Sequence, residues 1–191
     1  MLFRSSAAVS SAAASLKAAG NSAYELVIYQ KVSIGDGKMA NNPWLQEMPD
    51  PITRACWDNY AIISTAAAKE LFPDLNMDQY EVEPPKPVLK LKVGSKEVSL
   101  PVLIIPGTQK NTIAVAVGYG RSEKIGLAAK GAGKNVYHLV ANNGRNYDYN
   151  GIAVSVEKTG ENYPIAQMQT HTTYGDRHEV VKETKIGRAH V

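Results

Sequence analysis

The fold of this chain is decided by one stretch, which reads Val88-Leu89-Lys90-Leu91-Lys92-Val93-Gly94-Ser95-Lys96-Glu97-Val98-Ser99-Leu100. Apolar and polar residues alternate over residues 88–93, as in a strand that buries one face. Gly94 and Ser95 supply a tight turn, and residues 96–100 form the returning strand of a β-hairpin. The stretch therefore predicts antiparallel β-structure in the middle of the chain.

Further strands and a few short helices are expected on either side of this hairpin. Segments rich in β-branched and aromatic residues predict strands at residues 24–32, 57–63, 112–117, 136–140, 151–156 and 165–169. Helices are expected at residues 5–19, 65–71 and 124–129, the second of them after the N-cap residue Ser64. Loops are expected at residues 142–144 and 147–151. The sequence thus predicts a small β-rich domain with short helices.

Composition limits the classes of protein to which the chain can belong. Its 191 residues, of which 44% are hydrophobic, suit one domain, or one domain with a piece of another. The formal charge is only +3, and acidic and basic residues are interleaved, so nothing favours nucleic acid as a partner. No run of about 18 apolar residues predicts a membrane-spanning helix.

The last seven residues have an unusual origin in our interpretation. Lys185-Ile186-Gly187-Arg188-Ala189-His190-Val191 is the peptide encoded by the start of a common sequencing adapter, whose next codon is a stop. We therefore expect residues 185–191 to be adapter read-through and the natural chain to continue beyond Thr184. Without Lys185 and Arg188 the chain has 19 basic and 18 acidic residues, a net charge of +1.

Residues that could carry catalysis or bind a metal are sparse. Cys56 is the only cysteine, so neither a disulfide nor a cysteine-ligated cluster can form within the chain, and we expect a buried thiol. The histidines form no ligand motif; they are His138, His171, His178 and His190. Glu47, Asp50 and Asp58 are close in sequence, but nothing in their spacing demands an acid–base pair, and Asp50 between two prolines suits a turn. We expect no metal site and no catalytic residue here.

Two glycine-containing segments are candidates for ligand contact. Residues 131–135 resemble a phosphate-binding loop superficially, but Ala128 and Asn135 stand where that motif needs Gly and Ser or Thr, so we interpret the glycines as turn residues. Gly118-Tyr119-Gly120-Arg121 ends a predicted strand. Glycines let backbone amides approach a ligand, and Arg121 can pair with a phosphate or carboxylate. The alternative for this second segment is a plain turn.

A long irregular segment lies between the first two predicted strands. It contains Asn41-Asn42-Pro43-Trp44-Leu45-Gln46-Glu47-Met48-Pro49-Asp50-Pro51, whose three prolines argue against a helix or a central strand across it. A loop of this length inside a compact fold is usually functional or part of an interface. We expect Trp44, Leu45 and Met48 to anchor it, either on its own domain or on a partner protein.

Several of these segments together resemble one protein family. Residues 31–40, the proline-rich loop, and Trp57-Asp58-Asn59-Tyr60 are similar to the large molybdopterin-oxidoreductase-like iron–sulfur subunit of bacterial alternative complex III, a quinol:electron-acceptor oxidoreductase. Residues 117–124, 133–137 and 167–171 fit the same family. The resemblance covers residues 5–184, and the proline-rich loop is its most specific part.

The resemblance implies a fold and a division into parts. Residues 56–184 would form a double-psi β-barrel, as in the C-terminal domain of molybdopterin oxidoreductases. Residues 1–35 would be the last helix–strand unit of a preceding α/β domain, and residues 36–55 the connecting loop. In molybdenum enzymes the positions matching Gly118, Tyr119, Gly120 and Arg121 lie towards the pterin cofactor.

The resemblance also implies a role and a location. The subunit would act at the periplasmic side of the bacterial inner membrane, as scaffold and docking surface for other subunits of a respiratory complex. Iron–sulfur clusters would lie in a domain downstream of this chain, and molybdopterin is not expected. Two alternatives remain open, namely a true molybdopterin-dependent oxidoreductase in which Gly118–Arg121 touch the cofactor, and a freestanding ligand-binding barrel.

Overall fold

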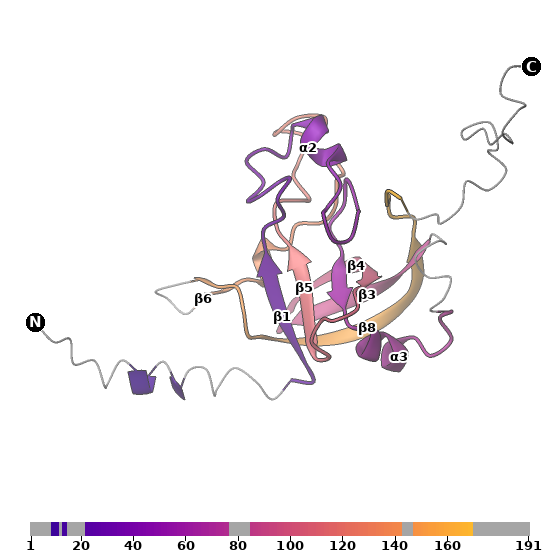
Figure 1. Cartoon of the computed structure of the whole chain (residues 1–191). Helices are drawn as coiled ribbons and strands as arrows, with labels where there is room; N and C mark the ends of the chain where they lie inside the picture. Colours follow the sequence, from indigo (N-terminus) through magenta and orange to yellow (C-terminus); the bar gives the residue numbers. More distant parts are fainter. Residues whose placement is uncertain (1–8, 12, 15–21, 77–84, 143–146, 170–191) are drawn as a thin grey trace, which may run out of the picture.

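A closed β-barrel forms the body of the protein (Figure 1). The computed structural model describes residues 9–11, 13–14, 22–76, 85–142 and 147–169. Six strands follow one another around the barrel in the order β1-β5-β2-β4-β3-β8. They are β1 (Tyr24–Tyr29), β2 (Ala61–Ile63), β3 (Lys86–Val93), β4 (Lys96–Ile104), β5 (Thr112–Ala116) and β8 (Ile152–Tyr163). The predicted β-rich fold is confirmed.

The barrel contains both parallel and antiparallel strand pairs. The β3–β4 hairpin predicted from the alternating sequence is antiparallel, and its turn joins Val93 to Lys96 across Gly94 and Ser95. By contrast, β1 runs parallel to β5, and β2 runs parallel to β4. The remaining neighbours in the barrel pair antiparallel.

Strand β1 belongs to this barrel. The resemblance places residues 1–35 at the end of a preceding α/β domain, whereas β1 hydrogen-bonds to β5 on one side and β8 on the other. Its inward residues Leu26 and Ile28 are 0% and 4% exposed and lie in the main core. Burial of this apolar face inside the barrel places the strand there.

Alternation along the strands explains the core. Leu89 and Leu91 are fully buried, whereas the intervening Lys90 and Lys92 face outward, with side-chain ammonium groups close to Glu97 and Glu157. Each buried leucine contributes about 1.5–3 kcal/mol through removal from water. The outer ion pairs are exposed and contribute little.

Two short α-helices flank the barrel, at opposite ends in Figure 1. Helix α3 (Thr65–Leu71) follows the expected N-cap, because the Ser64 hydroxyl accepts a 3.0 Å hydrogen bond from Ala67 N. Helix α2 (Pro43–Glu47) was not expected within the proline-rich loop. It forms because Pro43 occupies the first helical position, where its missing N–H is not needed, and Asn42 accepts from Trp44 N as the N-cap.

Other local predictions are corrected. Residues 57–60 are not a strand, since Trp57 has a φ of 63°, which breaks an extended backbone. Residues 124–129 form turns instead of a helix, and residues 165–169 contribute only an isolated bridge from Gln167 to Ala55. The predicted strand at 136–140 is the 3₁₀-helix η1 (Tyr137–Leu139).

A small hairpin follows η1, and short parts of the chain ends are described. Residues 147–148, predicted as loop, form the short strand β7 (Tyr147–Asp148), which pairs with β6 (Ala141–Asn142). Residues 9–11 and 13–14 are helical, as expected, while the rest of the helix predicted at residues 5–19 lies outside the described residues. The tail at 185–191 also lies outside them.

Loops gather at the α2 end of the barrel and form what we call the cap, residues 31–60 and 117–136. The cap has a small apolar cluster of its own, separate from the barrel core. Its buried members are Ile34, Ala40, Tyr119 and Ala129 of the cap, together with Ala116 at the end of β5. Leu45 of the cap and Tyr29 at the end of β1 pack against them. The cap contains the residues that the sequence singled out as candidates for function.

Candidate functional site

The turn from Gly118 to Arg121 packs tightly inside the cap. Both glycines have positive φ, 97° at Gly118 and 67° at Gly120. A Cβ atom on Gly118 would lie 2.9 Å from the Gly35 carbonyl oxygen, and one on Gly120 would lie 2.0 Å from Asn135 N. Glycine is therefore required at both positions, because neighbouring backbone occupies the place that a Cβ atom would take.

The two side chains of this turn are also engaged by the protein. Tyr119 is 2% exposed and belongs to the cap's apolar cluster. The Arg121 guanidinium donates a 2.8 Å hydrogen bond to the Asp36 carbonyl oxygen and lies 5.7 Å from the Tyr137 ring centre. Tyr137 donates to the same Asp36 oxygen at 2.7 Å. Arg121 therefore clamps the two loops of the cap together, and a cofactor contact by Gly118, Tyr119, Gly120 and Arg121 stays a prediction.

Residues 131–135 are bonded to the other loop of the cap, just before β2. Gly133 N donates to Asp58 Oδ1 at 3.0 Å, and Lys134 N donates to Asn59 Oδ1 at 2.8 Å. A Cβ atom on Gly133 would lie 2.6 Å from Asn59 Oδ1, and its φ is 60°. These amides point at Asp58 and Asn59, so the interpretation of the glycines as turn residues is confirmed.

The three predicted anchor residues of the proline-rich loop divide into two roles. Leu45 packs against the apolar cluster of the cap. Trp44 is 82% exposed and Met48 is 41% exposed. More large apolar side chains are exposed on the same cap, namely Val32, Met39, Ile52, Ile125 and Leu127. The loop is thus anchored on its own domain through Leu45 while α2 presents Trp44 to solvent.

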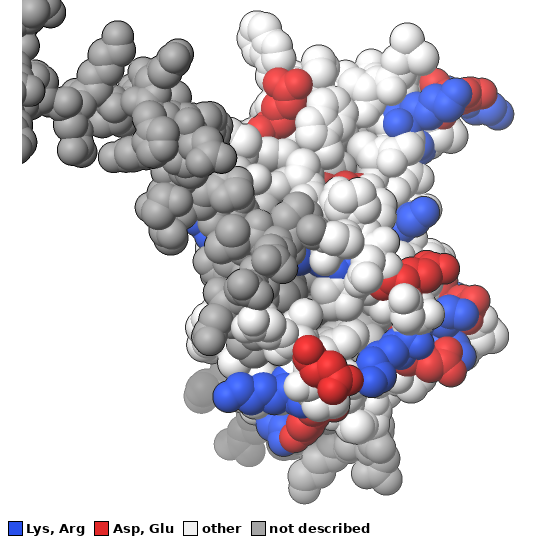
Figure 2. All heavy atoms as spheres, turned by 90° about the vertical axis from the view of Figure 1, so that its right-hand side faces the viewer, with Lys and Arg blue, Asp and Glu red and all other residues white. Residues whose placement is uncertain are grey.

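Charged side chains occur at both ends of the molecule. On the face shown in Figure 2, interleaved acidic and basic side chains are densest towards the lower part, and the upper part has fewer of them, including a paired acidic and basic group at its right-hand edge. The barrel strands carry the pairs of Lys92 with Glu157 and Lys90 with Glu97. No helix among the described residues is long and apolar enough to cross a membrane.

A buried amino group that no sequence pattern indicated lies in the cap. Lys31 follows β1 and is only 3% exposed. Its Nζ lies 4.6 Å from the Tyr60 ring centre and 5.2 Å from that of Tyr119, and it donates to the Asp58 carbonyl oxygen at 3.2 Å. Burial lowers the pKa of Lys31 to about 8, against the opposing effect of Asp50, Cys56 and Asp58.

A polar network continues from this lysine towards the proline-rich loop. The Thr53 hydroxyl donates to Asp50 Oδ1 at 3.1 Å and shares a short hydrogen bond with the Tyr60 hydroxyl. Asp50 also accepts from Ile52 N and Thr53 N, so the prediction that it forms a turn is confirmed. Burial raises the pKa of Tyr60 and of Tyr29, which is hydrogen-bonded to it.

The three carboxylates that are close in sequence do not form an acid–base pair. Asp58 is bound by Gly133 N and by the Tyr163 hydroxyl, and burial raises its pKa. Asp50 is occupied by its own turn. Glu47 is exposed, and its carbonyl oxygen accepts from the Cys56 thiol at 3.2 Å. Cys56 is buried, as predicted, and burial raises its pKa, so the thiol is not activated.

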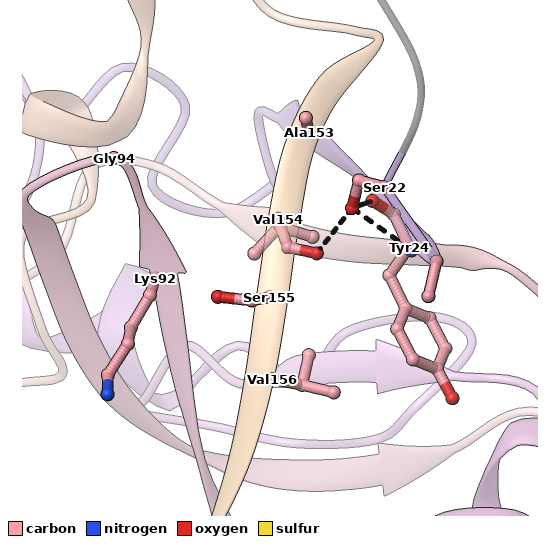
Figure 3. A pocket seen from close by; sticks show the side chains of 9 residues that line it. Ser22, Tyr24, Lys92, Gly94, Ala153, Val154, Ser155 and Val156 are labelled. Carbon is pink, nitrogen blue, oxygen red and sulfur yellow. Dashed lines mark hydrogen bonds between the residues drawn. The ribbon is translucent and has the colours of Figure 1, made fainter.

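A surface groove of about 500 Å³ lies away from the cap, between the start of β1, β8 and the β3–β4 turn (Figure 3). Its walls include Tyr24, Val154 and Val156. The Ser22 hydroxyl is occupied by the carbonyl oxygens of Tyr24 and Val154, at 2.6 and 2.7 Å. Lys92 is paired with Glu157 at 2.7 Å. The groove therefore presents mainly apolar surface, with the Ser155 hydroxyl among its polar groups.

Comparisons with known proteins give limited information. No known protein family matches the sequence, and no curated protein matches it significantly. Among solved structures, the chain is similar to acetylene hydratase from Pelobacter acetylenicus, with a TM-score of 0.46 and 13% sequence identity over 71% of this chain. The chain spans 18% of the length of that protein. A likeness this distant concerns the arrangement of the backbone and carries no inference about activity or cofactor.

Proposed function

We propose that this chain is the barrel region of the iron–sulfur subunit of a respiratory quinol:electron-acceptor oxidoreductase of the alternative complex III type, where it serves as scaffold and docking domain. The sequence resemblance over the proline-rich loop and residues 57–60 supports the family. The two parallel pairs, β1–β5 and β2–β4, in a closed six-stranded barrel support the double-psi type.

The observation that carries the docking role is the contrast between two parts of the cap. The turn from Gly118 to Arg121 is engaged by neighbouring loops. In contrast, helix α2 presents Trp44, which is 82% exposed, and Met48, which follows the helix, is 41% exposed. Exposed tryptophan and methionine side chains are common at the centre of protein interfaces. The partners in this proposal are other subunits of the membrane-bound complex at the periplasmic side, and electron transfer runs through clusters outside this chain.

The docking role can be tested by substituting Trp44 in the assembled complex. We expect Trp44→Ala to lower the yield of intact complex on native gels at least tenfold, since a central interface tryptophan typically contributes 2 kcal/mol or more, on the order of thirty-fold in affinity. Tyr147→Ala is the matched control, because Tyr147 is an aromatic residue 66% exposed in β7, outside the cap. Equal yields for both variants would remove Trp44 from the interface.

One observation favours a second candidate function, a molybdopterin-dependent oxidoreductase. Arg121 Nε is buried and has no hydrogen-bond partner among the described residues. A buried donor without a partner is unusual and is a possible contact for an anionic group. Molybdenum and pterin analysis of the natural full-length protein separates the two functions. If the protein contains a stoichiometric cofactor and Arg121→Met loses it, the chain belongs to a molybdopterin-dependent oxidoreductase and the docking proposal is wrong.

A further inference from the structure

The groove beside the start of β1 exists because two strands cover different parts of β8. Strand β1 pairs with residues 152–154 of β8, whereas β3 pairs with residues 155–163 along the other edge. Among the described residues, no strand lies on the β1 side of β8 beyond residue 154. Tyr24 and Val156, both half-buried, and the exposed Ala153 supply apolar surface in this opening (Figure 3). Exposed apolar surface of this kind is a place where another segment packs.

A short helical segment precedes the barrel. Residues 9–11 and 13–14 are helical and exposed, and Val9 is 65% exposed. Isolated helices shorter than about 12–15 residues are marginal in water, because most helical stability in proteins comes from packing of one apolar face. A helix in this segment therefore needs a surface on which Val9 can be buried.

The sequence around these residues gives the helix one apolar face. Leu2, Val9 and Leu16 follow one another at intervals of seven residues, a spacing that places them on the same side of an α-helix. Ala12 and Ala13 lie between them on that side. The remaining sides carry three serines, namely Ser10, Ser11 and Ser15. The segment therefore matches an apolar surface along one face only.

The chain leads from this helix directly to the groove. Ser22 is part of the groove wall, and its hydroxyl donates a 2.7 Å hydrogen bond to Val154 O. Gly20 and Asn21 come immediately before it, and both residue types are common where helices end and the chain changes direction. A helix that reverses direction at these two residues lies over the groove.

We propose that residues 2–16 pack as a helix in the groove between β1, β8 and the β3–β4 turn, with Leu2, Val9 and Leu16 towards the barrel. The lining of the groove offers no unpaired charge against this apolar face, since Lys92 is the one charged residue that lines it and is paired with Glu157. The helix then completes the barrel next to β1, in place of the preceding α/β domain that the resemblance implies. This packing is independent of the docking role of α2, which lies at the opposite end of the barrel in Figure 1.

Photo-cross-linking in the whole 191-residue chain tests the proposal. The variant Ser155→p-benzoylphenylalanine places the reactive group at an exposed position of the groove, where it leaves the barrel core intact. Trypsin releases residues 5–17 as one peptide, because Arg4 and Lys17 bound it. We expect this peptide to be the main product joined to residue 155 in mass spectrometry. Failure to detect it overturns the proposal.

The variant Trp44→p-benzoylphenylalanine is the control for position. Trp44 is 82% exposed and lies in α2, so the substitution leaves the barrel core intact and the reactive group is far from the groove. We expect no cross-link above background between residue 44 and residues 5–17. Equal yields from positions 44 and 155 would mean that the segment contacts the surface at random, which overturns the proposal.

An equal mixture of nitrogen-15-labelled and unlabelled chains identifies the source of the helix. Packing within one chain gives cross-linked peptides that are labelled in both halves or in neither half. Products with one labelled half would show that the helix comes from a second copy of the chain, and the proposed packing would be wrong.

Two substitutions in the Ser155 cross-linking chain assign the face of the helix. We expect Val9→Asp to lower the yield of the cross-link about tenfold or more, because it would place an unpaired charge in an apolar groove. Ser11→Asp is the matched control, since it adds the same charge on the opposite side of the helix, and it should leave the yield unchanged. Both positions precede the barrel strands, so the barrel folds in either variant. Equal yields in the two variants overturn the packing of Val9 in the groove.

Discussion

The hydroxyl of Tyr163 donates a 2.9 Å hydrogen bond to Oδ2 of Asp58, although the two residues are 105 positions apart in the sequence. Tyr163 is the last residue of β8, and Asp58 lies in the cap. Since Asp58 Oδ1 also accepts from Gly133 N, one carboxylate joins the end of the barrel to both loops of the cap. The orientation of the cap relative to the barrel depends on this carboxylate.

We expect Asp58→Ala to lower the free energy of unfolding by about 1–3 kcal/mol, because it leaves two partly buried donors without an acceptor. Tyr163→Phe, which removes one hydrogen bond and keeps the ring, should cost about 1 kcal/mol. Urea unfolding followed by far-UV circular dichroism measures both. In the double variant the Tyr163→Phe change should have almost no further effect; full additivity would mean that the two groups do not interact.

Close packing at Gly120 predicts a large penalty for any side chain. Gly120→Ala combines a positive φ with a Cβ atom 2.0 Å from Asn135 N, so the 117–121 and 131–136 segments would have to separate. We expect a loss of about 3 kcal/mol or more in thermal unfolding. Gly131→Ala is the control: its φ is 77°, and nothing lies within 4 Å of the added Cβ, so only the backbone term of about 1 kcal/mol applies. Equal losses would show that crowding at Gly120 is unimportant.

The free energy of unfolding should depend on pH between the folded-state and unfolded-state pKa values of Lys31. Its folded-state pKa, about 8, lies below the unfolded value of 10.5, so the unfolded state binds more protons in between and stability rises with pH. We expect a gain of about 1.4 kcal/mol from pH 7 to pH 9 in urea unfolding. Above pH 10 the trend should reverse, since burial raises the pKa of Tyr119 and Tyr163 to about 12 and unfolding releases their protons. A Lys31→Met chain that gains as much between pH 7 and pH 9 would contradict the first part.

The stability of helix α2 should depend on its N-cap residue, Asn42, more than on the length of the helix. It has five residues, too few for stability on its own, and Asn42 accepts from both Trp44 N and Leu45 N. We expect Asn42→Ala to cost about 1 kcal/mol and to raise amide hydrogen exchange at Trp44 and Leu45 at least fivefold. Asn42→Asp, which retains the acceptor, should restore protection; exchange that is unchanged in Asn42→Ala would show that packing of Leu45 alone orders the helix.

The elements that sequence patterns predicted correctly are those whose structure is determined locally. The β3–β4 hairpin follows from the alternation of apolar and polar residues on either side of Gly94 and Ser95. Helix α3 follows from its N-cap residue, Ser64. The errors arise where tertiary contacts override local preference. Residues 136–140 have strand-like composition, but Val136 and Leu139 insert into the core as part of a 3₁₀ turn. Helix α2 had a readable signal in Asn42-Pro43, an N-cap followed by proline, which the density of prolines obscured.

The candidate site was predictable in part. The turn at Asp50 follows from the sequence, since Asp favours turns, whereas the sequence left open whether Trp44 packs on its own domain or faces outward. Burial of Lys31 could not be predicted, because lysine is almost always solvated and its enclosure needs three segments that meet only in the folded chain. The same holds for the glycine turn, where the sequence suggests an open ligand-binding loop and the packed neighbours come from Gly35 and Asn135.

Closure of the barrel has a consequence for how the chain reaches its native state. Strand β1 is synthesised first but needs β8 as one neighbour, and the register joins Leu26 to Ile152. Most of the polypeptide must therefore leave the ribosome before the first strand can complete its hydrogen bonds, which favours slow folding of high contact order. A nascent chain that ends before Ile152 leaves the outer edges of β1 and β3 unpaired. During synthesis these edges invite pairing with other chains, so arrest or early termination upstream of β8 should produce aggregates instead of a smaller folded domain.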